Sequence, residues 1–308
     1  MQQKLKGEIL LLLAALIWGS AFIFQKMGMD YIGPFTFGFF RFTLGALALI
    51  PVILIFDRLR ERTREKSGSD ETAKYSFKNK ELLIGGLLTG LACFVASSFQ
   101  QVGIVYTTAG KAGFISSLYI VLVPICLIFF RKKVSFITWI AIAVGAFGLY
   151  LLCITENFTI SLGDGLVVCC ALFYALQIIF IDIYVDRTDP AKLAFLEFMV
   201  TGILSGVAML LFETVELQAV LDCVVPILYT AVFEVSIAFT LGIFGQQYTP
   251  PTIAAILMSL ESVFAVLCGM LFLGEVMSGR EIMGCVVMFA AVLISQLHTE
   301  AKADSKRE

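Results

Sequence analysis

Ten long apolar runs, separated by mostly short polar links, constrain this chain more than any other feature. A helix that crosses a bilayer needs about 20 mostly apolar residues, and each run is close to that length. The composition agrees, because 59% of the 308 residues are hydrophobic and only 15% are charged, and a soluble protein of this size carries more polar surface. The sequence therefore predicts an all-α polytopic membrane protein. The ten predicted transmembrane helices are at roughly 8–28, 34–56, 81–104, 108–130, 135–153, 163–185, 190–212, 221–244, 250–273 and 279–298.

One polar stretch, 57–80, is much longer than the other links. It has no apolar period, and we predict a solvated loop that is partly disordered. Lysine and arginine accumulate in the cytoplasmic segments of membrane proteins. With the N-terminus in the cytoplasm, 18 of the 22 lysines and arginines fall on that side, including eight in this loop. We therefore expect a multi-pass protein with both termini, and the tail at 299–308, in the cytoplasm.

The chain also contains an internal repeat. An apolar run that begins at Pro34 has a counterpart 156 positions later at Pro190, and each has a charge seven positions after its proline. That charge is Arg41 in the first copy and Glu197 in the second. Further along, the dipeptide at 117–118, Ser-Leu, recurs 142 positions later. The sequence therefore divides into two related halves.

Each half, 8–153 and 163–298, contains five of the predicted helices. Because five is odd, the second copy must enter the membrane in the opposite sense to the first. Inverted repeats of this kind are typical of secondary transporters, in which the substrate site lies near the membrane midplane between the repeats.

Charged side chains inside the apolar runs are the main functional candidates, because such a charge is costly in a membrane and normally faces the protein interior. The neighbours of Arg41, Glu197, Glu234 and Glu261 at helical spacing are mostly small residues, as in closely packed membrane helices. We therefore expect all four charges to point inward. For each, a structural ion pair and contact with a substrate or a coupled proton are both open.

Opposite charges at equivalent positions also suggest a direct relation between Arg41 and Glu197. Burial disfavours an ionised carboxylate and a nearby arginine favours it, so the two effects compete. If they balance, Glu197 can exchange a proton during transport. If the arginine dominates, the two residues form a structural clasp between the halves.

Uncharged side chains and one lysine complete the candidate set. Lys111 can snorkel to the outer interface or reach a central cavity. Trp18 and Gln25 share one side of the first helix, where they can line a pocket or pack against lipid. The amides of Gln100 and Gln246 favour hydrogen bonds between helices over ligand binding. The candidate substrate-binding or coupling residues are Trp18, Gln25, Arg41, Gln101, Lys111, Tyr119, Tyr174, Gln177, Glu197, Glu234 and Glu261.

Catalytic and metal-binding patterns are not met. The dipeptide Gly110-Lys111 resembles the end of a phosphate-binding loop, but valine at 105 and alanine at 112 occupy positions that require glycine and a hydroxyl. The eight cysteines contain no CxxC pair, and the single histidine is His298, so we expect neither a metal site nor a cofactor. We expect the protein not to be an enzyme.

Several ordered motifs together resemble the EamA family of the drug/metabolite transporter (DMT) superfamily. They are Ala15–Phe22 (ALIWGSAF), Pro34 with Arg41-Phe42, Tyr106–Pro124 (YTTAGKAGFISSLYIVLVP) and Ser259–Glu275 (SLESVFAVLCGMLFLGE). The resemblance covers roughly 8–298. It implies ten transmembrane helices as two inverted five-helix EamA repeats, moving small metabolites by alternating access across a bacterial plasma membrane.

The chain departs from the family pattern in two places. Lys132-Lys133 stand where the second half has Gly274-Glu275, and Tyr174 stands where the first helix has Trp18. Members of the family carry amino acids, sugars, nucleobases and drugs, so the resemblance names no substrate.

The sequence as a whole predicts a secondary exporter of a small polar or amphiphilic metabolite such as an amino acid. Its partners would be that substrate, the lipid bilayer and, if transport is coupled, protons; no nucleic acid is expected, and the oligomeric state is left open. An uptake carrier of the same superfamily is the alternative within transport. A channel or a non-transport membrane scaffold is the alternative from another class.

Overall fold

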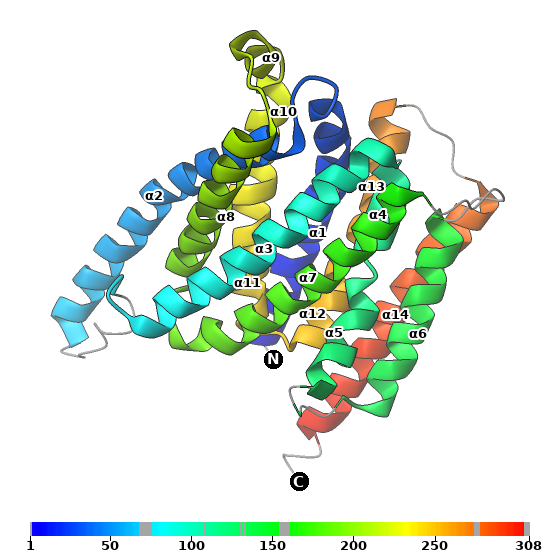
Figure 1. Cartoon of the computed structure of the whole chain (residues 1–308). Helices are drawn as coiled ribbons and strands as arrows, with labels where there is room; N and C mark the ends of the chain where they lie inside the picture. The colour runs from blue at the N-terminus through cyan, green and yellow to red at the C-terminus, as the bar shows by residue number, and fades with distance from the viewer. Residues whose placement is uncertain are drawn as a thin grey trace.

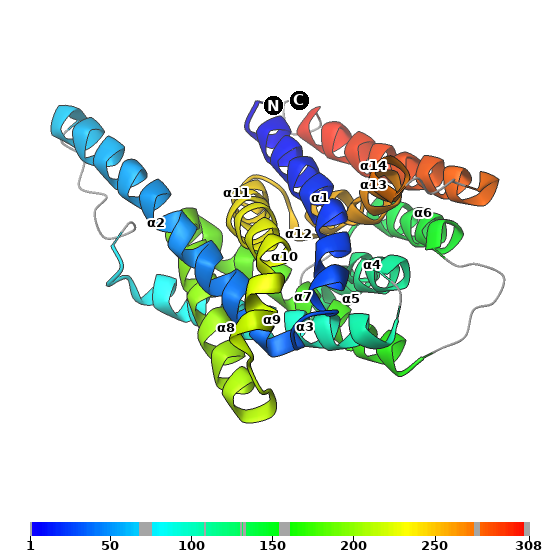
Figure 2. The same cartoon turned by 90° about the horizontal axis from the view of Figure 1, so that it is seen from above.

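The computed structural model describes residues 2–67, 76–107, 109–129, 131, 134–153, 161–273 and 278–304. Over these residues the chain is helical and has no strand, which confirms the predicted all-α class. Figures 1 and 2 show a bundle of inclined helices, in which the two termini lie at one end and α9 lies at the other.

The elements are given in chain order. They are α1 (Gln2–Gly28), α2 (Pro34–Ser67), α3 (Lys80–Tyr106), α4 (Ala109–Ser116), α5 (Tyr119–Phe129), α6 (Phe136–Cys153), α7 (Leu162–Tyr184), η1 (Val185–Arg187), α8 (Pro190–Phe212), α9 (Leu217–Asp222), α10 (Val224–Tyr229), η2 (Thr230–Phe239), α11 (Thr240–Gln246), α12 (Pro251–Met258), α13 (Glu261–Leu273) and α14 (Gly279–Asp304).

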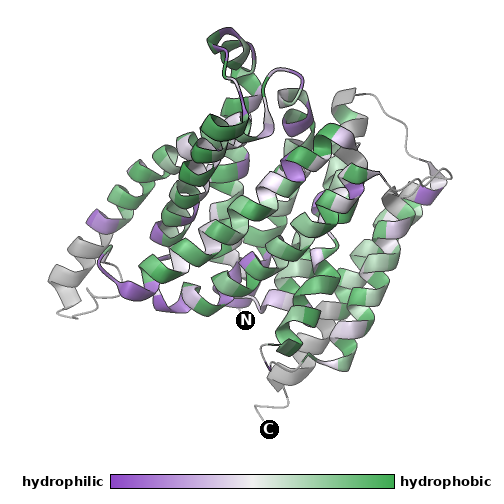
Figure 3. Ribbon diagram, viewed as in Figure 1, coloured by the Kyte–Doolittle hydropathy of each residue, from purple (hydrophilic) through white to green (hydrophobic). Residues whose placement is uncertain are grey.

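All ten predicted apolar runs lie in helices. Within the described residues, eight helical segments are long and apolar enough to cross a membrane. The apolar parts of α6 and α14, Phe136–Leu151 and Ile282–Ile294, are shorter, and these two helices pack against each other. Apolar residues run along most helices while hydrophilic residues gather near the ends (Figure 3). Large apolar side chains such as Leu210 and Leu271 are also exposed, as expected where lipid covers the protein.

The predicted helices 108–130 and 250–273 are each present as a segment long enough to cross a membrane, but each is interrupted by a short turn. The first divides into α4 and α5 at Ser117-Leu118, and the second into α12 and α13 at Ser259-Leu260. At each break a serine hydroxyl lies within hydrogen-bond distance of a backbone carbonyl oxygen of the preceding turn, Ser117 Oγ of Gly113 O and Ser259 Oγ of Ile256 O, both at 2.8 Å. Such bonds compete with the helical pattern. The breaks fall at the positions that the internal repeat equates.

The predicted helix 221–244 is also irregular. It consists of α10, the π-helical segment η2 and α11, and the separate short helix α9 precedes it. A π-helix is rare and often lies at a functional site. Here Glu234 is in the middle of the π-helical segment.

The prediction of a loop over 57–80 is wrong for its first part. Helix α2 continues to Ser67, because 57–67 is rich in arginine, glutamate and lysine, which are good helix formers. In the same way α14 extends into the predicted tail, as far as Asp304. The link that remains after α2 is therefore much shorter than the sequence suggested.

Close helix contacts depend on glycine at a few positions. Gly19 of α1 faces α13 so closely that an added Cβ would lie 2.6 Å from Phe264 Cβ and 2.7 Å from the carbonyl oxygen of Glu261. Backbone atoms cannot move aside as a flexible side chain can. The sequence therefore requires glycine where α1 supports the start of α13, and this contact helps to fix the position of Glu261.

Candidate functional site

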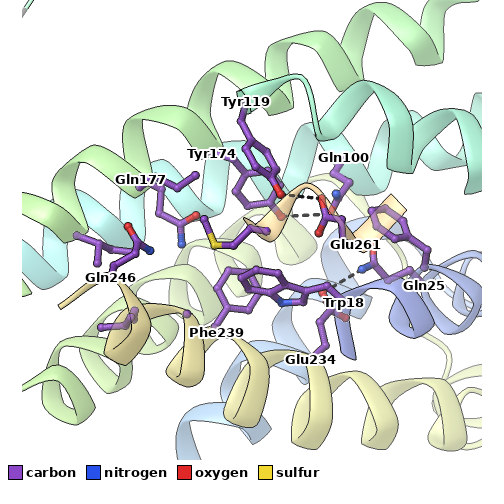
Figure 4. Close-up of a pocket in the computed structure, with 16 residues that line it drawn as sticks. Trp18, Gln25, Gln100, Tyr119, Tyr174, Gln177, Glu234, Phe239, Gln246 and Glu261 are labelled. Atoms are coloured by element: carbon purple, nitrogen blue, oxygen red, sulfur yellow. Dashed lines mark hydrogen bonds between the residues drawn. The ribbon is translucent and has the colours of Figure 1, made fainter. Parts of the chain in front are cut away.

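A cavity lies between helices of both halves of the chain (Figure 4). Its walls come from α1, α3 and α5 in the first half and from α7, η2, α11, α12 and α13 in the second. The free space is about 50 Å³, which holds several water molecules, so a larger ligand requires the walls to move outward. The lining residues are Trp18, Phe22, Gln25, Gln100, Tyr119, Tyr174, Gln177, Ile178, Ile181, Glu234, Phe239, Gly242, Ile243, Gln246, Met258 and Glu261.

Glu261 follows the break between α12 and α13 and contacts the break between α4 and α5. Its Oε1 accepts hydrogen bonds from Tyr119 Oη and from Ser117 Oγ, each at 3.1 Å. Ser117 Oγ in turn lies 2.7 Å from Ser262 Oγ. Tyr119 and Glu261 are the first residues of α5 and α13, so the broken ends position both side chains. The carboxylate is held by hydroxyl groups and has no ion-pair partner among the described residues.

Glu234 is the second carboxylate in the wall. Its Oε1 accepts from Arg41 Nη1 at 2.9 Å and from Gln25 Nε2 at 3.0 Å. Arg41 is fully buried and lies over the rings of Phe37 and Phe42. Arginine and carboxylate compensate each other's charge in this setting, which is what a buried charge requires.

The structure contradicts the predicted clasp between Arg41 and Glu197. Arg41 pairs with Glu234, whereas Glu197 accepts a hydrogen bond from Gln177 Nε2. Equivalent positions in a repeat need not face each other, because each helix is rotated by its own packing. Arg41 of α2 reaches Glu234 of η2, whereas Glu197 of α8 reaches Gln177 of α7. The broader prediction that these charges face inward is confirmed, since all four are buried: Arg41, Glu197, Glu234 and Glu261.

The aromatic candidates line the cavity from both halves. Trp18 and Tyr174, which the repeat equates, are both in the wall. Trp18 contacts Phe239 edge to face, with ring centroids 5.1 Å apart. Tyr174 Oη donates to Gln100 Oε1 at 3.1 Å. The indole nitrogen of Trp18 is buried, and none of the residues that the structure describes is its hydrogen-bond partner.

Four candidates are not among the described lining residues, and one of them, Arg41, lies behind the wall. Gln101 is beside the cavity and donates to the backbone carbonyl of Gln25 at 3.2 Å. Glu197 is behind the wall, joined to it through Gln177. The side chain of Lys111 lies outside the described residues, as does the Gly274-Glu275 motif.

Sequence reasoning undervalued three lining residues, Gln100, Gln246 and Phe239. The sequence favours interhelical hydrogen bonds for the two glutamines, and both are in the cavity wall. Phe239 follows Glu234 by five positions, and this spacing brings two side chains to one face in a π-helix but not in an α-helix. No α-helical pattern could have revealed it.

Comparison with known proteins gives the family. The sequence profile described as the EamA-like transporter family matches residues 5–154 and, a second time, residues 161–297. The chain belongs to the EamA-like transporter family. An uncharacterized transporter of Archaeoglobus fulgidus is 33% identical to this EamA protein over 301 residues, which is 96% of this chain and 87% of the relative.

A protein of known crystal structure has the same fold. It is 16% identical to this EamA protein and covers 96% of it, with 98% of its own length aligned and a TM-score of 0.73. The EamA profile matches each half separately, as the internal repeat predicted. The cavity residues come from both matched ranges. This membrane protein is therefore a transporter by family, and its cavity lies where the two EamA units meet.

Proposed function

We propose that this EamA protein is a secondary exporter of a small metabolite that works by alternating access. The observation that carries the proposal is the cavity, which both halves enclose and which contains two buried carboxylates at irregular helix segments. Transporters place substrate and coupling-ion sites at such interrupted helices. In this proposal α6 and α14 also cross the membrane, which gives ten spans in two inverted five-helix repeats, 8–153 and 163–298.

Glu261 is the carboxylate that we assign to proton coupling. It lines the cavity, and its partners among the described residues are hydroxyl groups. Glu234, in contrast, is paired with Arg41, and Glu197 lies behind the wall. A carboxylate that opens to either side in turn can exchange a proton for a substrate. The substrate gradient alone is the other possible driving force.

The proposal is tested by a survival and efflux screen. Cells that overproduce the chain would be challenged with toxic amino acids, nucleobase analogues and cationic dyes, and we expect at least one challenge to show higher survival and faster saturable efflux. Higher sensitivity would instead indicate uptake, and flux without saturation would indicate a channel. If neither survival nor flux changes while the protein is present in the membrane, transport is contradicted and a scaffold is favoured.

The proposed orientation makes a second prediction. Ser76 lies between α2 and α3, and Gln218 lies in α9. In a cysteine-free background, we expect a cysteine at Ser76 to react with a membrane-impermeant thiol reagent only from the cytoplasm, and one at Gln218 only from outside. Reaction of both from the same side would contradict the inverted repeats.

A further inference from the structure

We infer that the cavity recognises the ammonium group of a small organic amine that carries no carboxylate. This inference rests on the proposed transport function and specifies its substrate class. It follows from the hydrogen-bonding groups that the cavity leaves unused, from the absence of a matching cation among the described residues, and from the aromatic walls.

Two of the unused groups near the carboxylates are acceptors in the cavity wall, while the unused Nε donor of Arg41 lies behind that wall. Glu234 Oε2 and Gln25 Oε1 are buried and have no hydrogen-bond partner in the described part of the chain. The partner of the Gln25 amide fixes its orientation: its nitrogen donates to Glu234 Oε1, so its oxygen is the free atom. Glu261 accepts its hydrogen bonds through Oε1, and among the described residues no donor reaches its Oε2. A buried acceptor without a hydrogen bond destabilises the protein, and a ligand that donates to it removes that cost. An ammonium group supplies three N–H donors.

A substrate carboxylate would find no cation in the described part of the wall. None of the described lining residues is basic. Arg41 lies behind the wall and is already paired with Glu234. Lys26, on the same helix as Trp18, donates to the carbonyls of Ile104 and Thr107 at 2.8 and 3.3 Å. An unpaired buried carboxylate is costly, so these walls favour a cation over a zwitterion or an anion.

The aromatic walls fit the same ligand. Five of the lining side chains are aromatic: Trp18, Phe22, Tyr119, Tyr174 and Phe239. The faces of aromatic rings attract cations, with tryptophan the most effective. The indole N–H of Trp18 remains available for one acceptor, such as a hydroxyl or ether oxygen on the substrate.

The test compares three ligands that share one carbon skeleton. These are 2-phenylethylamine, L-phenylalanine, which adds a carboxylate next to the amine, and 3-phenylpropionate, which keeps the carboxylate and lacks the amine. Binding to the purified full chain in detergent would be measured by thermal stabilisation at neutral pH. We expect the amine to bind at least about tenfold more tightly than phenylalanine, and the anion not to bind.

A matched pair of variants assigns the effect to the cavity. Glu261→Gln should weaken amine binding at least about tenfold, whereas Glu216→Gln, at an exposed position beside α9, should leave it unchanged. Equal or tighter binding of phenylalanine or phenylpropionate would overturn the inference, as would a folded wild-type protein that binds no amine.

The inference and the transport proposal can fail separately. Movement of phenylalanine in preference to the amine in proteoliposomes would overturn the amine inference and keep transport. Tight binding of the amine with no movement of any of the three ligands would keep the recognition and count against transport.

Discussion

Glu261→Gln is expected to abolish transport driven by a pH gradient while the protein still folds and inserts. Glutamine has nearly the same size as glutamate, and its oxygen can still accept hydrogen bonds from Tyr119 and Ser117, which hold Glu261 now. What the substitution removes is the group that can take up and release a proton. We expect the initial rate to fall by roughly 100-fold, which is the size of effect typical of losing a proton-transfer group.

This result would be measured in proteoliposomes with an imposed pH gradient, using any substrate that the efflux screen identifies. Glu197→Gln is the matched control, because Glu197 is buried like Glu261 but lies behind the cavity wall, bonded to Gln177. We expect this control to keep most of the activity. Wild-type rates for a well-folded Glu261→Gln would remove Glu261 from proton coupling.

Separating Arg41 from Glu234 is expected to cause the largest loss of stability. Their ion pair is 2.9 Å long, and both side chains are almost completely buried. Glu234→Leu would leave the arginine buried without its carboxylate, which costs about 3–5 kcal/mol in buried pairs of this kind. Arg41→Met alone should also destabilise, because it leaves the carboxylate of Glu234 with Gln25 as its remaining partner.

The double variant, Arg41→Met with Glu234→Leu, should recover much of that stability, because it removes both buried charges together. Thermal unfolding in detergent would measure all three proteins. Arg187 and Glu81 form a comparison pair that is 3.6 Å long and well exposed, and removing such a pair costs about 0–1 kcal/mol. If the double variant is no more stable than the singles, the charges are not coupled as the structure indicates.

The helices and their inward-facing charges could be predicted from the sequence because they depend on local pattern. Each apolar run lies in helical structure, and the small residues around Arg41 and Glu197 correctly indicated that these side chains are buried. The repeated dipeptide at 117 and 259 marked related positions. It did not reveal that the helices break there, since serine hydrogen bonds to the preceding turn are also compatible with a continuous helix.

The partners of the buried charges could not be predicted, because they depend on how each helix is rotated against its neighbours. The repeat could not predict the partner of Glu234, because the equivalent residue in the first half, Ala92, is apolar. The π-helical segment that aligns Glu234 with Phe239 also has no α-helical sequence pattern. The Arg41–Glu234 pair and half of the cavity wall therefore required the three-dimensional structure.

Alternating access requires the cavity to open in turn to both sides of the membrane. Met258 lines the cavity and is 3% exposed, so a cysteine at this position, in a cysteine-free background, reports directly on access. We predict that a membrane-impermeant thiol reagent labels Met258→Cys from the cytoplasmic side and, in a separate sample, from the outer side, and that bound substrate slows both reactions. Labelling from one side alone, with complete labelling of the unfolded protein, would contradict alternating access through this cavity.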